Sequence, residues 1–262
     1  MLGSAAGTHL TAHSGRVAII GPDEPANRYG RHPVYGSHYD EGRITRMLDP
    51  DPVWARLAQR SILAYEKLEA QTGISFFREV GHLYVSDQTG DPDSRLSRVR
   101  HNADNMGVSY QILDHADLER EFPYLLFARN SLGLYQRRLA GHLSPRAFVQ
   151  ASTRRAAQQG AQIIRETVAE VSPGKDGKQV QIRTLTGQHY TAGKVLLASG
   201  GFSNCHQLFG RPLDLRVYAR TVLLARLEAD RVHYLAGMPS VIYSHSSMPT
   251  GYYLLPPFRY PD

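Results

Sequence analysis

A glycine near the N-terminus, followed by small residues, could bring a helix close to a phosphate group. After Gly3 the chain is small and polar to His13, turns at Ser14-Gly15, and continues as an apolar segment that ends at Gly21. The first run predicts a helix and the apolar segment predicts a strand. The free N–H groups and the positive dipole end of such a helix favour phosphate. The pattern is typical of a dinucleotide site, although close packing of a helix on a sheet explains Gly3 equally well.

Two arginines form the second candidate for chemistry. Segment 36–46 is polar, is bracketed by glycines and ends in Arg43 and Arg46. On the residues alone, surface arginines paired with Asp40 or Glu41 are the favoured interpretation.

The other reactive residue types have structural alternatives. His38 has no cysteine or acid at ligand spacing, so we expect no metal site there. His82 and His142 follow glycines at strand-like positions, which favours structural roles. The pair Tyr252-Tyr253 could line a pocket or belong to the core. Cys205 is the single cysteine, which excludes an internal disulfide; we expect it to be a buried apolar residue.

Composition limits the classes of function. The chain has 262 residues, enough for one large or two ordinary domains, and no apolar run approaches the ~20 residues of a membrane span. A basic stretch followed by an apolar stretch is absent at the N-terminus, so no secretory signal is expected. The 30 basic and 24 acidic residues are scattered and accompany no known motif, so we expect no nucleic acid as partner. A cytoplasmic location fits the cysteine content.

The elements that must position these residues alternate along the chain. Beyond the first helix, caps, apolar spacing and stop residues predict helices at 52–72, 94–106, 114–122 and 145–159. Strands are expected at 16–21, 76–86, 132–139, 161–164, 167–171, 179–185, 195–198, 220–227 and 241–243. This order predicts a mixed α/β fold, in which an α/β nucleotide domain is interrupted by a mixed domain.

Short segments in the same order along nearly the whole chain resemble the flavin-dependent amine oxidases of the D-amino-acid oxidase superfamily, closest to the sarcosine oxidase-like branch. The matching segments are 3–20, 36–46, Leu68-Glu69, 81–85, 141–145, Gly160-Ala161 and 195–201. The resemblance implies a Rossmann-like FAD-binding domain interrupted by a substrate domain with a mixed β-sheet. By position, the FAD-binding domain would comprise 1–81 and 141–213, and the substrate domain 82–140 and 214–262.

The activity implied by the resemblance is oxidation of a small amine that carries a carboxylate. FAD would take a hydride from the carbon next to the nitrogen, the imine would hydrolyse, and molecular oxygen would reoxidise the flavin to give hydrogen peroxide. Two alternatives stay open. One is a 2-hydroxy acid dehydrogenase of the same fold that passes electrons to a carrier, and the other is a non-catalytic remnant that binds a partner or an anion.

The resemblance also implies which residues would contact FAD. Gly3 is similar to the last glycine of the pyrophosphate turn, and Gly200 would approach the pyrophosphate. Ser37 and His38 lie in the segment similar to the loop beside the flavin ring. Val168 would offer its backbone to the adenine.

Three residues would lie near the reaction. Arg43 would sit beside the isoalloxazine, where a fixed cation stabilises negative charge. Arg46 would hold the substrate carboxylate, for which its planar guanidinium is well suited. Tyr253 would line the substrate pocket.

The chain departs from the family pattern in three places. No strand or leading glycines precede Gly3, and the acid expected at the end of the second strand is replaced by Gly21, with Asp23 and Glu24 just beyond. The family also continues where this chain stops at Asp262, through an expected flavin-linked cysteine and an oxygen-activating lysine. We therefore expect a fragment that is truncated at both ends.

Overall fold

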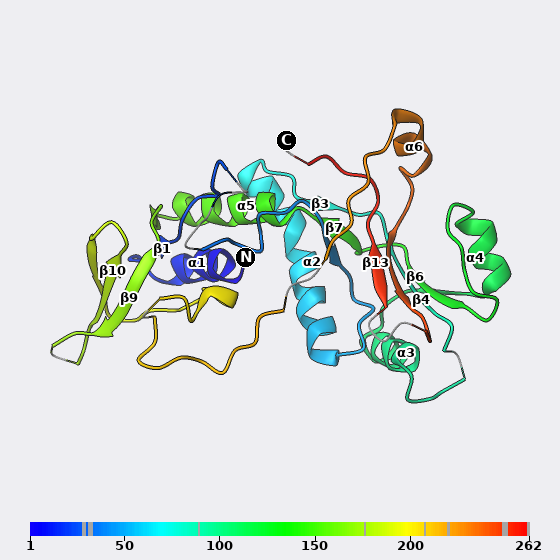
Figure 1. Ribbon diagram of the computed structural model, residues 1–262, viewed down its shortest axis with the longest axis horizontal. Coiled ribbons are helices and arrows are strands. Elements are labelled where there is room, and N and C mark those ends of the chain that lie inside the picture. Colours follow the sequence, from blue (N-terminus) through cyan, green and yellow to red (C-terminus); the bar gives the residue numbers. More distant parts are fainter. Residues whose placement is uncertain are drawn as a thin grey trace. The chain divides into compact units, whose positions relative to one another are not determined.

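The computed structural model describes the chain in two compact units (Figure 1). It describes residues 1–262 except 28–29, 31–33, 89, 176, 207, 219–220, 248–250 and 261–262. Unit 1 comprises Met1–Asp40 and Arg146–Leu224, and unit 2 comprises Glu41–Pro145 and Ala225–Asp262. The predicted division of the chain differs at 41–81, 141–145 and 214–224. The assignment of functions to the two domains stays a prediction.

The helices of the described part follow the predicted ones closely. The first five agree with the sequence within two residues at each end, and α6 lies in a region predicted to be rich in strands. They are α1 Leu2–His13, α2 Pro52–Thr72, α3 Arg95–Met106, α4 His115–Glu121, α5 Pro145–Gln158 and α6 Ala229–Tyr234, with a 3-10 turn at Gly200–Phe202.

Helix α2 shows how local signals set its ends. The Asp51 carboxylate accepts hydrogen bonds from the first-turn N–H groups of Val53 and Trp54, and Gly73 ends the helix in the left-handed conformation. The helix is predicted from apolar residues at helical spacing that include Trp54 and Leu57. These residues do not face the core, because Trp54 is 65% exposed and Leu57 is 49% exposed. Four other side chains are buried instead, namely Ala55, Ile62, Tyr65 and Thr72.

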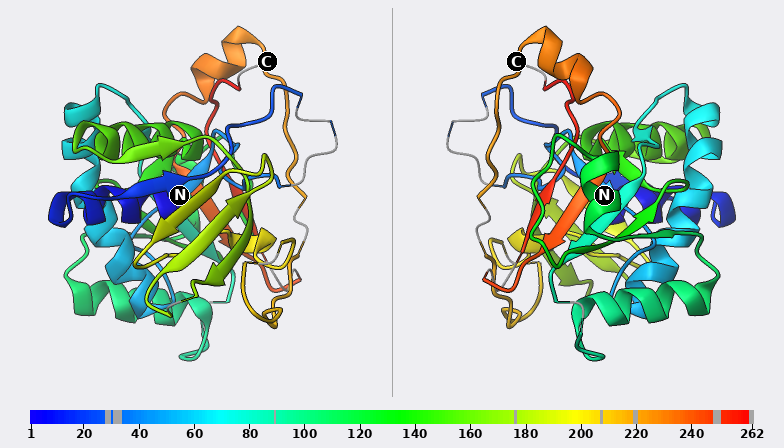
Figure 2. Two further views of the ribbon diagram at one scale, coloured as in Figure 1. Left: turned by 90° about the vertical axis from the view of Figure 1, so that its left-hand side faces the viewer. Right: turned by 90° about the vertical axis from the view of Figure 1, so that its right-hand side faces the viewer.

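Unit 1 contains two small sheets. A parallel pair joins β1 (Ala18–Ile20) to β8 (Gln162–Ile164). An antiparallel meander, drawn in yellow-green in Figure 2, contains β9 (Val168–Pro173), β10 (Val180–Thr184) and β11 (His189–Ala192). The predicted strands at 161–164, 167–171 and 179–185 are thereby confirmed.

A three-stranded antiparallel sheet in unit 2 explains why the observed units differ from the predicted division. Its order is β2-β7-β3, formed by Arg43–Thr45, Gly141–Leu143 and Phe77–Arg78. Hydrogen bonds therefore tie the segments around residues 44, 77 and 142 into one unit. A Cβ atom on Gly141 would collide with the carbonyl oxygen of Arg78, so this strand approach requires glycine.

The second sheet of unit 2 is mixed, as expected. Its order is β13-β12-β4-β6-β5, formed by Tyr252–Leu254, Ser240–Ser244, His82–Ser86, Leu132–Gln136 and Gln111–Leu113. Strands β12 and β4 run parallel, and the other pairs run antiparallel. Because side chains alternate between the faces of a sheet, this register gives it two faces of different character.

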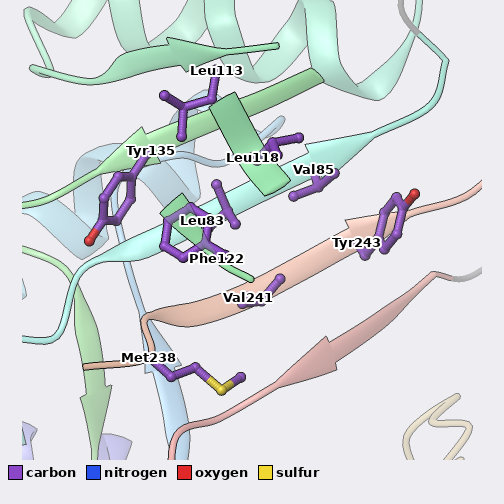
Figure 3. Close-up of a cluster of buried hydrophobic side chains, with 9 residues drawn as sticks. All are labelled: Leu83, Val85, Leu113, Leu118, Phe122, Tyr135, Met238, Val241 and Tyr243. Atoms are coloured by element: carbon purple, nitrogen blue, oxygen red, sulfur yellow. The ribbon is translucent and has the colours of Figure 1, made fainter. Parts of the chain in front are cut away.

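One face of this sheet carries the hydrophobic core of unit 2 (Figure 3). Leu83 and Val85 of β4 are fully buried there, and α4 adds Leu118 while Phe122 follows at its end. The other face carries the buried polar side chains of His82, Ser86, Gln136 and Ser240. We call it the polar face.

Two predicted strands and one predicted burial are wrong. Segment 195–198 forms no strand, and Val195 is 38% exposed and Leu196 64% exposed. Segment 221–227 is likewise unpaired, while Arg220 lies outside the described residues. Apolar composition indicates a strand, but a strand also needs a hydrogen-bonding neighbour, and no described strand pairs with either segment. Cys205 is exposed rather than buried.

Candidate functional site

In unit 1, small residues let α1 lie close against β1 (Figure 1). A Cβ atom on Gly7 would lie 2.8 Å from Cγ1 of Ile19 and closer still to its Cδ1. A Cβ atom on Gly3 would lie 3.2 Å from Cβ of Ala198. Thr8 fixes the other side of the helix by donating a 2.7 Å hydrogen bond to the carbonyl of Ser152 on α5. The close helix–strand approach predicted from the glycines is present.

The N-terminal end of α1 offers backbone donors that fit a pyrophosphate. The first helical hydrogen bond runs from the Ala5 N–H to the Met1 carbonyl at 3.1 Å, so the N–H groups of Leu2, Gly3 and Ser4 have no intrahelical acceptor. The N-cap residue is Met1, and its side chain accepts no hydrogen bond from these groups. Free N–H groups at the positive end of a helix suit an anionic ligand, so these residues fit the phosphate part of FAD.

Gly200 and Val168, both expected to contact the cofactor, lie in unit 1. Gly200 has a φ of +57°, and no atom lies within 4 Å of the position that its Cβ would occupy. Its backbone is therefore open to an approaching group, and glycine adopts this conformation without strain. Val168 begins β9 and is half-buried. Neither residue is shown to contact α1, so their roles toward FAD stay predictions.

His38 lies within the electrostatic influence of the N-terminal end of α1. Burial lowers the pKa of His38 to about 4, and the positive α-amino group of Met1 acts in the same direction. His38 is therefore neutral at neutral pH, and its ring packs on Tyr39 with 4.4 Å between centroids. Ser37 precedes it in a turn. No three His, Cys, Asp or Glu side chains of the described residues gather as metal ligands would.

The two acids beyond β1 have different partners. Glu24 receives two hydrogen bonds from the Arg146 guanidinium, at 2.5 and 2.8 Å, and the side chains are 26% and 14% exposed. Asp23 forms a 3.1 Å ion pair with Arg165, and these side chains are 68% and 53% exposed. The Glu24 carboxylate is thus engaged within the protein, whereas Asp23 is the more accessible acid near Gly21.

In unit 2, the two candidate arginines lie on β2 and directly after it. Arg43 donates a 3.0 Å hydrogen bond from its Nη1 atom to the carbonyl of Gly42. Arg46 donates from Nη2 to Oδ2 of Asp49 at 2.7 Å, and its buried Nε–H has no acceptor within the described part of the chain. Burial lowers the pKa of Arg46, which Asp49 partly offsets. The predicted partners of the arginines were Asp40 and Glu41, so the pairing of Arg46 with Asp49 is a correction.

The polar face of the mixed sheet lies next to Arg46. The Met47 N–H donates to Oε1 of Gln136 at 3.1 Å, which fixes the chain after Arg46 to β6. On β4, His82 stands opposite Gln136 and is fully buried, and none of the described residues forms a hydrogen bond with its Nε2 atom. Burial lowers the pKa of His82 well below its usual value, and the positive charge of Arg46 lowers it further.

Tyr253 shares this polar face. It pairs with Ile242 on β12, and Ile242 pairs with Tyr84 on β4, so the three side chains stand in one row. Tyr84 is fully buried, and burial raises the pKa of its hydroxyl, which the charges of Arg95 and Arg46 partly offset. Tyr253 is 49% exposed at the sheet edge. Unit 2 therefore brings Tyr253 onto the face that borders Arg46.

Asp49 and the His82–Ser240 pair are features that sequence reasoning missed. Asp49 follows Arg46 by three residues, a spacing at which an ion pair forms readily in a tight turn, so its signal was present. Ser240 is placed beside His82 only by the parallel pairing of β12 with β4. No local pattern indicates that pairing.

Comparisons with known proteins agree with the resemblance. The chain is 31% identical over 205 residues to the monomeric sarcosine oxidase of Streptomyces avermitilis, covering 77% of this chain and 50% of that protein. It is 22% identical over 197 residues to the peroxisomal sarcosine oxidase of Mus musculus, covering 75% of this chain and 47% of that protein. The chain thus spans about half the length of the curated relatives it matches.

A solved structure shows the same fold. The open form of NikD, described as an unusual amino acid oxidase essential for nikkomycin biosynthesis, superposes with a TM-score of 0.60 at 24% identity, covering 78% of this chain and 50% of that one.

None of the helices in the described ranges combines the length and hydropathy needed to cross a membrane. The model of the FAD dependent oxidoreductase family, DAO, matches residues 1–259. This chain therefore belongs to the FAD dependent oxidoreductase family.

Proposed function

We propose that the protein oxidises the CH–NH bond of a small amino acid or N-methyl amino acid, with oxygen as the acceptor and hydrogen peroxide as the product. Family membership and the likeness to sarcosine oxidases support an oxidoreductase that acts on an amine. The observation that carries the choice of substrate is Arg46, a guanidinium beside the polar face that is 17% exposed and whose buried Nε–H has no acceptor among the described residues.

Unit 1 would hold the phosphate end of FAD. The N–H groups of Gly3 and Ser4 donate to the pyrophosphate, and the open backbone of Gly200 lets the same group approach. Ser37 and neutral His38 lie in the segment assigned to the flavin ring, and Val168 offers its backbone to the adenine. When bound, FAD supplies the acceptor for the hydride that leaves the carbon next to the amine nitrogen.

Unit 2 would bind and orient the amine. Arg46 holds the carboxyl end of the substrate, and a fixed end leaves the reacting carbon in one orientation. Arg43 provides a cation for the isoalloxazine, and the aromatic ring of Tyr253 lines the substrate pocket.

We also propose that the protein acts in the cytoplasm, which its single cysteine supports.

The test uses the protein expressed from its whole reading frame and purified with FAD. Anaerobic addition of N-methylglycine and other small amino acids should bleach the flavin, and admission of air should restore the colour and release peroxide. Matched 2-hydroxy acids should do neither. If hydroxy acids alone reduce the flavin, or no peroxide forms after amine oxidation, the proposed reaction is wrong.

A further inference from the structure

Arg46 lies beyond the end of β2, so the strand ladder does not hold the backbone that carries its guanidinium. Strand β2 ends at Thr45, and Met47 follows Arg46 in a buried position. A buried backbone N–H beyond the end of a ladder needs an acceptor of another kind. Oε1 of Gln136 on β6 accepts a hydrogen bond from the Met47 N–H at 3.1 Å, although the two residues are 89 positions apart.

The other end of the Gln136 amide is also engaged, which fixes its orientation. Its Nε2 atom donates to the carbonyl oxygens of Arg138 and Leu139 at 3.0 and 2.9 Å, and the side chain is fully buried. Exchange of the amide oxygen and nitrogen would set an oxygen against two carbonyls, so the oxygen must face the Met47 N–H. Gln136 therefore bridges the chain at Met47 to the turn that follows β6.

The guanidinium end of Arg46 has an attachment of its own. Oδ2 of Asp49 accepts a hydrogen bond from Arg46 at 2.7 Å, and the backbone carbonyl of Asp49 accepts from the Asn102 side chain on α3 at 3.0 Å. The segment 46–49 is thus attached to β6 near its start and to α3 at its end. A guanidinium on a fixed backbone loses less conformational freedom when it binds a carboxylate.

We propose that Gln136 is a positioning residue, which anchors the backbone beside Arg46 and thereby raises the affinity of its guanidinium for the substrate carboxylate. This inference rests on the proposed function, in which Arg46 holds the carboxyl end of the amine. Gln136 acts only through Arg46, so its contribution to substrate binding should disappear when the guanidinium is absent.

The test uses the whole protein with FAD and follows anaerobic reduction of the flavin by N-methylglycine. Gln136→Asn keeps an amide but is one methylene shorter, so it cannot reach the Met47 N–H and the turn carbonyls together. It should weaken the apparent substrate affinity by about ten-fold and leave the limiting rate of reduction nearly unchanged. In an Arg46→Met background the same substitution should change the rate at low substrate concentration by less than about two-fold, because residues that act as a unit are not additive.

Gln111→Met is the matched control, because it removes a 2.8 Å hydrogen bond from Arg137 at the edge of the same sheet. It should leave the substrate affinity unchanged. An unchanged affinity in Gln136→Asn, or a ten-fold loss that persists in the Arg46→Met background, overturns the proposal.

Hydrogen exchange separates this inference from the proposed function. The Met47 amide should exchange at least about ten-fold faster in Gln136→Asn than in the wild type, when each rate is compared with that of the Leu118 amide in α4 of the same unit. Equal relative rates would overturn the anchoring even if amines are oxidised. If none of the tested amines reduces the flavin, the proposed function fails, whereas the exchange rates still decide whether Gln136 anchors the chain.

Discussion

The Nδ1 atom of His82 lies 3.0 Å from the hydroxyl of Ser240, 158 positions later in the chain. That hydroxyl donates to the carbonyl of Gly81 at 3.1 Å, so it accepts a hydrogen bond from the Nδ1–H of His82. The ring is neutral at neutral pH, and its buried Nε2 lone pair accepts no hydrogen bond from the residues that the structure describes. This pair joins β4 to β12 on the polar face. It lies next to Arg46, the arginine on which the proposed function depends.

His82 should make the protein sensitive to acid. Its pKa in the folded chain lies well below the unfolded value of about 6.5, so the unfolded chain binds the extra proton below that pH. The free energy of unfolding should therefore fall as the pH drops below about 6.5. Urea denaturation between pH 7 and pH 4.5 should show a smaller loss in His82→Asn than in the wild type. Exposed His9→Asn is the control, and an unchanged slope in His82→Asn would show that another group is responsible.

Gly141 should be intolerant of any side chain. A Cβ atom there meets the Arg78 carbonyl in the next strand, and φ is +155°. Gly141→Ala should lower the free energy of unfolding of unit 2 by at least about 2 kcal/mol, a typical cost of forcing atoms into a packed site. Gly193→Ala, at a position with nothing within 4 Å, should change stability by less than about 0.5 kcal/mol. Equal effects of the two substitutions would contradict the β3–β7 geometry.

Glu24 and Asp23 should differ sharply despite being adjacent. Glu24→Gln removes the carboxylate that accepts two hydrogen bonds from the partly buried Arg146 guanidinium, which should cost about 2–4 kcal/mol of stability. Asp23→Asn removes an exposed pair and should cost less than about 1 kcal/mol. Chemical denaturation of both variants measures the difference. Loss of equal stability in the two variants would mean that Arg146 does not depend on Glu24.

Local signals predicted most helices and their ends. Asp51 and Gly73 bound α2 because a carboxylate at the N-cap and a left-handed glycine at the C-cap act within one turn of the chain. The glycines of α1 likewise predicted its close approach to β1. These features depend on neighbours in sequence, so the sequence alone contains them.

Features that depend on distant segments were not predicted. Segment 195–198 has the composition of a buried strand, yet no described strand pairs with it. The row that joins Tyr253 to Tyr84 depends on the register of three strands, which residue types do not set. The pairing of Arg46 with Asp49 was missed because Asp40 and Glu41 offered the same charge at similar spacing.

The most direct test of the central claim is an NMR titration with FAD of the protein expressed from its whole reading frame, following the backbone amides at the N-terminal end of α1. FAD and ADP should give saturable shifts at Gly3 and Ser4, because both ligands carry a pyrophosphate, whereas AMP should give much smaller ones. The amide of Ser97 in the first turn of α3, already bonded to Ser94, serves as the control and should not move. An absence of shifts with FAD, or shifts of the same size with AMP, would contradict the assignment of this helix end to the cofactor.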